Sequence, residues 1–142
     1  MFQKILLATD GSHFADHAAD ATLAMATQLS GVEVVLLHVS SEPPSRSELL
    51  QAGMDVQFLL KENAQKLLAT TEEKFTRAEV SYSLQVALGD PADLIVKVSE
   101  EQNIDLIIIG SRGLGSVTSL LLGSVSRRVA QEASCPVMIV KA

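Results

Sequence analysis

Five short apolar runs alternate with longer segments of helical periodicity along this chain of 142 residues. The runs lie near residues 3–8, 33–39, 80–88, 105–109 and 136–140, and all except the third are almost continuously apolar. Continuous apolar runs are typical of strands buried on both faces, and their alternation with helices is typical of βαβ units. The sequence therefore predicts an α/β fold with an open, doubly wound parallel sheet of five strands and helices on both faces.

The third run is the more polar one, because Gln85 alternates there with apolar residues. One side of that strand should meet solvent, which is typical of a sheet edge.

Capping residues predict where the helices begin and end. Ser12 is a candidate N-cap of the first helix and Gly31 lies just past its end. Asp90 and Pro91 are a typical N-cap and first helical residue, for a helix that ends near Asn103. The last helix is expected from Ser124 to Ala133, and residues 40–46 are expected to form an exposed loop.

Two helices should bury a defined face. The first helix is predicted to pack small residues on the sheet, namely Ala15, Ala18, Ala19, Thr22 and Ala26. A long helical stretch is expected from about Asp55 to Arg77, with a buried stripe of Phe58, Leu59, Ala64, Leu67, Leu68 and Phe75.

Length and composition limit the protein class. A chain of this length with 47% hydrophobic residues is expected to form one domain over residues 1–142. The net charge of −6 argues against a general nucleic-acid binder. Cys135 is the only cysteine, so it is expected to be a small buried hydrophobe in a reducing compartment, with redox sensing as the alternative. No apolar run is long enough to cross a bilayer or to form a signal peptide, so we expect a soluble, cytoplasmic protein without membrane insertion.

A glycine-rich segment follows the fourth apolar run. It reads Gly110-Ser-Arg-Gly113-Leu-Gly115, and seven residues later comes Gly123-Ser124-Val125-Ser126. Glycines that leave a buried strand and return at the start of a helix allow backbone N–H groups to approach a phosphate. A Walker motif is excluded because the chain has no Gly-Lys pair, and the dinucleotide motif fails because Thr118 stands at its third glycine position.

The spacing Gly-x-x-Gly, nine residues, Gly-Ser resembles the signature of the ATP-binding members of the universal stress protein family. The resemblance extends over nearly the whole chain, through Lys4-Ile-Leu-Leu-Ala-Thr-Asp10-Gly11-Ser12, His38-Val39, Gly89-Asp90-Pro91-Ala92-Asp93 and Ser134-Cys135-Pro136-Val137. It is weakest at residues 41–60. The family fold implies the strand order 3-2-1-4-5, which would place strands 1 and 4 side by side.

The resemblance also implies a site for ATP, ADP or AMP. Backbone groups near Val39 would contact the adenine edge. Thr9 and Asp10 would contact the ribose or, through water, an Mg²⁺ or Mn²⁺ ion carried by the nucleotide. The phosphates would lie against Gly110, Arg112, Gly113 and the helix start. The full implied set is Ala8, Thr9, Asp10, Val39, Gly110, Arg112, Gly113, Gly123, Ser124, Val125 and Ser126.

The function implied is regulatory, with nucleotide occupancy changing conformation or assembly in a stress response. A protein-interaction module that binds no nucleotide and a slow ATPase are the alternatives. The lack of a candidate general base near the glycines argues against an enzyme. In the implied order the last strand is a sheet edge, so the resemblance implies a homodimer through Val137 to Val140, or a tetramer, and an unidentified client protein.

Several side chains have a second interpretation. Asp10 would serve equally as an Asx turn or helix cap, and Arg112, Arg127 and Arg128 equally as solvated charges or phosphate ligands. His13 and His17 lie one helical turn apart, which would suit a surface metal site, although a solvated stripe is favoured. His38 is expected to be a hydrogen-bonded core histidine.

Overall fold

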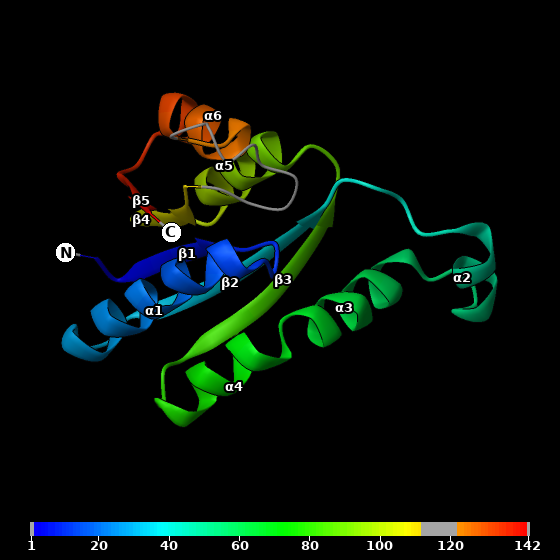
Figure 1. The fold of residues 1–142 in the computed structure, drawn as a ribbon, viewed down its shortest axis with the longest axis horizontal. Helices are drawn as coiled ribbons and strands as arrows, with labels where there is room; N and C mark the ends of the chain where they lie inside the picture. The colour runs from blue at the N-terminus through cyan, green and yellow to red at the C-terminus, as the bar shows by residue number, and fades with distance from the viewer. Residues whose placement is uncertain (1, 112–121, 142) are drawn as a thin grey trace.

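A computed structural model describes residues 2–111 and 122–141 of the chain, which form one parallel sheet with helices on both faces (Figure 1). The sheet has the order β3-β2-β1-β4-β5, and each neighbouring pair is parallel. Its strands are β1 (Lys4–Ala8), β2 (Glu33–Ser40), β3 (Tyr82–Leu88), β4 (Leu106–Gly110) and β5 (Val137–Val140). The predicted fold class, strand order and edge position of β3 are confirmed.

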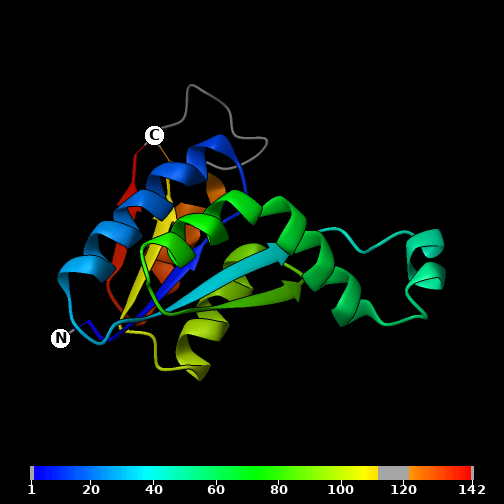
Figure 2. The ribbon, with the colours of Figure 1, turned by 90° about the horizontal axis from the view of Figure 1, so that it is seen from below.

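The helices cover the sheet from two sides. They are α1 (His13–Gln28), α2 (Arg46–Gln51), α3 (Val56–Leu67), α4 (Ala69–Arg77), α5 (Pro91–Glu101) and α6 (Ser124–Glu132). Figure 1 shows α1, α3 and α4 on one face and α5 and α6 on the other. The short helix α2 lies apart from both layers, beyond the end of the sheet (Figures 1 and 2).

Side chains of the central strands alternate between two hydrophobic clusters, one on each face, since successive strand residues point in opposite directions. Ile5, Leu7 and Leu36 pack with Ala18, Ala19 and Phe75 under α1 and α4. Leu6, Leu37 and Ile107 pack with Ile95 and Val129 under α5 and α6. Both faces of β1, β2 and β4 are therefore buried, which is the reason that their sequences are almost continuously apolar.

The caps of α1 and α5 are confirmed. The Ser12 side chain accepts a hydrogen bond from the Ala15 N–H, and Asp90 accepts one from the Asp93 N–H. The predicted small face of α1 is also confirmed for its first four members, all of them buried, whereas Ala26 is half-buried.

The helical stretch expected from about Asp55 to Arg77 is confirmed, but it consists of two helices. The backbone leaves helical geometry at Leu68 (φ −105°, ψ 15°), which divides the segment into α3 and α4. The predicted stripe is confirmed at its buried members Leu59, Ala64, Leu68 and Phe75, and Leu60 and Thr71 are buried beside them. Phe58 is 57% exposed, because two residues turn a helix by about 200° and place it opposite Leu60. Leu67, 47% exposed, lies at the break itself.

The expected loop at residues 40–46 is shorter than predicted. It lies between the end of β2 at Ser40 and the start of α2 at Arg46. The sequence did carry a signal for α2: Ser45 and Glu48 form a capping box, in which each side chain accepts the other residue's backbone N–H. None of the α2 residues is buried, so its stability comes from local bonds rather than from packing.

Candidate functional site

The carboxyl ends of β1 and β4 lie side by side in the sheet, and the crossovers that follow them leave to opposite faces. α1 follows β1 on one face, and α6 follows β4 on the other. Parallel α/β sheets bind ligands outside such a point, because the diverging chains leave a crevice there. The residues that surround this crevice are therefore the candidates for function.

A tight turn follows β1 at the crevice. The Thr9 side chain is buried, and its Oγ1 accepts a hydrogen bond from the Gly11 N–H over 3.2 Å. Asp10 Oδ1 accepts one from the Ser12 N–H over 2.9 Å, so Asp10 forms the Asx turn considered from the sequence. These bonds fix the direction in which α1 leaves the sheet and hold Asp10 at the crevice.

Gly11 has a positive φ of 74° and lies against the end of α3. A Cβ at this position would lie 2.5 Å from Leu67 Cγ, well inside van der Waals contact. The turn after β1 and the break between α3 and α4 are therefore packed against one another, and the position requires glycine on both grounds.

His38 links the end of β2 to the same turn. Its Nδ1 lies 3.0 Å from the Thr9 carbonyl oxygen, and the half-buried ring is a hydrogen-bonded histidine of the sheet, as predicted. Since a carbonyl only accepts, Nδ1 donates and carries the proton. The next residue, Val39, directs its half-buried side chain into the opposite cluster, beneath α5 and α6.

The start of α6 lies beside the end of β4. The Gly123 N–H donates to the Ser111 carbonyl over 2.6 Å, and the buried Ser126 Oγ donates to the Ser111 and Gly123 carbonyls. Gly110, the last residue of β4, is buried and pairs with Val140 of β5. These bonds fix the first turn of α6 against the crevice, with Ser124 exposed and Val125 half-buried.

α6 differs from the other helices in its N-cap. Side chains cap α1, α2, α3 and α5, whereas Gly123 provides no side-chain cap for α6. α4 also lacks a side-chain cap, but it continues directly from α3. First-turn N–H groups have no partner within a helix and carry partial positive charge. The N–H groups at the start of α6 are thus suited to an anion.

Arg128 makes ion pairs with three carboxylates. Its guanidinium contacts Asp90 and Asp93 at the start of α5 and Glu132 on α6. The Asp93 backbone N–H, assisted by Arg128, lowers the pKa of Asp90, and the two aspartates raise the pKa of Arg128. Arg128 therefore joins α5 to α6, a role that neither sequence interpretation included. Arg127 is exposed, whereas Arg112 and Gly113 lie outside the described residues.

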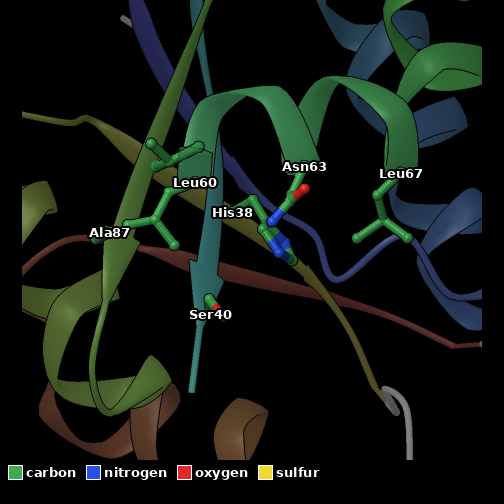
Figure 3. A pocket seen from close by; sticks show the side chains of 7 residues that line it. His38, Ser40, Leu60, Asn63, Leu67 and Ala87 are labelled. Atoms are coloured by element: carbon green, nitrogen blue, oxygen red, sulfur yellow. The ribbon is translucent and has the colours of Figure 1, made fainter. Parts of the chain in front are cut away.

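A pocket of about 260 Å³ lies at the carboxyl ends of β2 and β3, beneath α3 (Figure 3). Its lining residues are His38, Ser40, Leu60, Asn63, Leu67, Val86 and Ala87. Sequence reasoning missed Asn63, because nothing in the sequence shows that α3 crosses these two strands. Figure 3 shows the Asn63 side chain beside His38, with its amide nitrogen toward the ring and its oxygen away from it.

The remaining candidates contribute little to the site. Within residues 2–111 and 122–141, no three His, Cys, Asp or Glu side chains are grouped to hold a metal, and His17 is exposed on α1. The helices of the same residues include none long and apolar enough to span a membrane. Cys135 is half-buried and packs at the edge of a core cluster, and burial raises the pKa of its thiol.

Comparison with known proteins gives one consistent match. The model of the universal stress protein family matches residues 1–141. Universal stress protein YxiE of Bacillus subtilis is 32% identical, over 99% of this chain and 100% of YxiE. The solved structure of MJ0577, a protein of Methanocaldococcus jannaschii, has a TM-score of 0.81 at 31% identity, over 100% of this chain and 97% of its own. A family protein of Arabidopsis thaliana with AMP bound has a TM-score of 0.69 at 24% identity, over 98% and 91%.

Proposed function

The chain belongs to the universal stress protein family, and on that basis we propose that it is a regulatory protein that binds an adenine nucleotide in the crevice between β1 and β4. The uncapped start of α6 beside the end of β4 is the observation that carries the proposal. The Arabidopsis structure supports it further, since the same fold there holds AMP.

In this proposal the phosphates lie at the start of α6. The backbone N–H groups of Ser124, Val125 and Ser126, together with the exposed Ser124 hydroxyl, would donate to phosphate oxygens. Gly123 suits this role because it offers these N–H groups no side-chain acceptor of its own. Gly110, Arg112 and Gly113 are proposed to complete the phosphate contacts.

The sugar and the metal ion are proposed to lie near β1. Ala8 ends that strand, and Thr9 and Asp10 follow it in the hydrogen-bonded turn at the crevice. An Mg²⁺ or Mn²⁺ ion would be held by the phosphates and would neutralise part of their charge, with Asp10 contacting it through water. Backbone groups near Val39 are proposed to contact the base.

Nucleotide occupancy would then affect assembly through β5. The Ser111 N–H donates to the Val140 carbonyl over 2.9 Å, and Ser111 also accepts from Gly123, so two hydrogen bonds connect the α6 start to β5. β5 lies at the sheet edge and its four apolar residues are half-buried in the single chain. Unpaired strand edges pair with further strands. A homodimer through Val137–Val140 is therefore proposed, with a tetramer as a multiple of it.

The nucleotide proposal is tested by thermal unfolding with ATP and Mg²⁺. A ligand at a hundredfold excess over its dissociation constant adds about 2.7 kcal/mol to the free energy of unfolding. For a chain of this length the melting temperature should rise by roughly 5–10 °C. Replacement of Gly113→Val should remove the shift and leave the melting temperature without ATP similar.

Two results would contradict the nucleotide proposal. No shift with ATP, ADP or AMP would favour an interaction module that binds no nucleotide, and an equal shift in the Gly113→Val variant would place the site elsewhere. Mass spectrometry of the supernatant after denaturation gives an independent check, since a bound adenine nucleotide would be released there.

The proposed dimer has its own measurement. Light scattering after gel filtration should give twice the mass of the 15.1 kDa chain, or a multiple of that value. A single-chain mass at all concentrations would contradict the role of β5.

A further inference from the structure

An acidic pair lies beside the proposed phosphate position. Asp90 and Asp93, at the start of α5, contact the guanidinium of Arg128 on α6. α5 and α6 pack side by side, and each begins after the carboxyl end of a strand of the sheet (Figure 1). Arg128 is the fifth residue of α6, so its backbone lies about 6 Å along the helix axis from Ser124. The two carboxylates are therefore close to the turn of α6 that would hold the anion.

The charge of this pair opposes the binding of an anion. Carboxylates are ionised at neutral pH, and the hydrogen bonds that Asp90 accepts from the Asp93 N–H and from Arg128 lower its pKa further. The Debye length at physiological salt is about 8 Å, so charges within one or two helical turns of a phosphate are only partly screened. Without a compensating cation, Asp90 and Asp93 would repel the phosphates of a nucleotide.

Arg128 is the cation that compensates the pair. Each nitrogen of its guanidinium donates to a different carboxylate. Nη1 donates to Asp90 over 2.9 Å, Nη2 donates to Asp93, and Nε donates to Glu132 over 3.2 Å. The guanidinium is thus held among carboxylates with all three nitrogens engaged. This geometry favours neutralisation of the acidic pair over a direct bond from Arg128 to phosphate.

The same ion pairs contribute little to the packing of the two helices. The Arg128 side chain is 42% exposed, and exposed ion pairs add little to the free energy of unfolding. The contact between α5 and α6 is instead made by the buried side chains of Ala92, Ile95 and Val129. Replacement of Arg128 should therefore change the electrostatic surroundings of the α6 start and leave the fold intact.

We propose that Arg128 raises the affinity of the crevice for the phosphates of a nucleotide by neutralising Asp90 and Asp93, without binding the phosphates itself. The inference rests on the proposed function, because it takes the phosphates to lie at the start of α6. It assigns to an exposed ion-pair network the role of setting how strongly the crevice attracts an anion.

The test measures ATP binding in the presence of Mg²⁺ by isothermal titration at two salt concentrations. At about 0.05 M salt, Arg128→Gln should weaken ATP binding by about threefold to tenfold, because two carboxylates lose their compensating charge. At about 1 M salt the Debye length is only about 3 Å, so wild-type protein and Arg128→Gln should bind ATP almost equally. Arg128→Lys keeps the charge and should retain most of the wild-type affinity.

A second substitution distinguishes neutralisation from direct phosphate binding by Arg128. In the Arg128→Gln background, Asp93→Asn removes one of the two uncompensated charges and should restore part of the ATP affinity at low salt. If Arg128 bound the phosphates directly, the loss of Asp93 would not replace the missing bond. The absence of any restoration would therefore overturn the inference.

Lys97→Gln is the matched control. Lys97 is also an exposed cation that pairs with a carboxylate, Glu101, but it lies in the part of α5 remote from its start. Its replacement changes the net charge of the protein equally and should leave ATP affinity unchanged.

Three further results would overturn the inference and leave the nucleotide function standing. They are wild-type affinity in Arg128→Gln, a loss that persists undiminished at high salt, and an equal loss in Lys97→Gln. Failure of the wild-type protein to bind ATP would refute the proposed function and this inference together.

Discussion

The contact between Gly11 and Leu67 gives a quantitative prediction about the turn that carries Thr9 and Asp10. Replacement of Gly11→Ala places a side chain on a backbone with φ of 74° and puts the new Cβ 2.5 Å from Leu67 Cγ. The backbone conformation alone costs an L-residue about 1–2 kcal/mol. Overpacking against Leu67 costs about 1–3 kcal/mol more. The free energy of unfolding should therefore fall by about 2–5 kcal/mol.

A double-mutant cycle separates the two contributions. Leu67→Ala alone should cost about 1 kcal/mol, because the side chain is 47% exposed and loses only part of its buried surface. With Leu67 already shortened, Gly11→Ala should cost only the backbone contribution of about 1–2 kcal/mol. The coupling energy between the two sites is then about 1–3 kcal/mol.

Urea unfolding monitored by circular dichroism measures all four proteins of the cycle. If Gly11→Ala lowers the free energy of unfolding equally with Leu67 intact and in the Leu67→Ala background, to within about 0.5 kcal/mol, the Leu67 side chain does not pack against the turn. That result would refute the packing of the α3 end against the crevice.

Three further predictions concern the core, the α6 start and acid stability. Phe75→Ala should lower the unfolding free energy by about 3–5 kcal/mol, whereas Phe58→Ala should change it by less than about 1 kcal/mol, because Phe75 is fully buried and Phe58 is 57% exposed. Equal losses in urea unfolding would contradict the position of the helix break. Ser126→Ala should cost about 1–2 kcal/mol in the same assay, because its buried hydroxyl donates to two carbonyls at the α6 start, and no loss would show that these bonds do not hold the turn. Hydrogen bonds from the N–H groups of Gln3 and Lys4 lower the pKa of Asp105 in the folded protein, so the contribution of Asp105 to the stability of the fold is complete above about pH 4 and is lost as the pH falls further. Asp105→Asn should therefore weaken the dependence of the melting temperature on pH in that acidic range. An unaltered acid profile would argue against those bonds.

The sequence determined the layers of the fold because burial leaves a direct pattern in residue types. Strands buried on both faces must be apolar at every position, so β1, β2 and β4 were predictable from their runs alone. Ser12 and Asp90 were predictable as caps because a short acceptor before a helix satisfies an unpaired N–H. The strand order came from resemblance to a family, since no residue pattern in one chain specifies which strands are neighbours.

The tertiary structure determined the features that depend on how separate helices and strands pack against one another. Helical periodicity extends smoothly through residues 55–77, and only the contact of α3 and α4 with the sheet fixes the break at Leu68 and the exposure of Phe58. The sequence left Arg128 equally suited to solvent or to phosphate, whereas in the folded chain it makes ion pairs with Asp90 and Asp93 at the start of α5. Asn63 and His38 line one pocket because α3 packs over the carboxyl ends of β2 and β3, and no local spacing in the sequence relates these two residues. The local sequence thus determined the identity of the elements, whereas the candidate site depends on contacts between elements that only the folded chain creates.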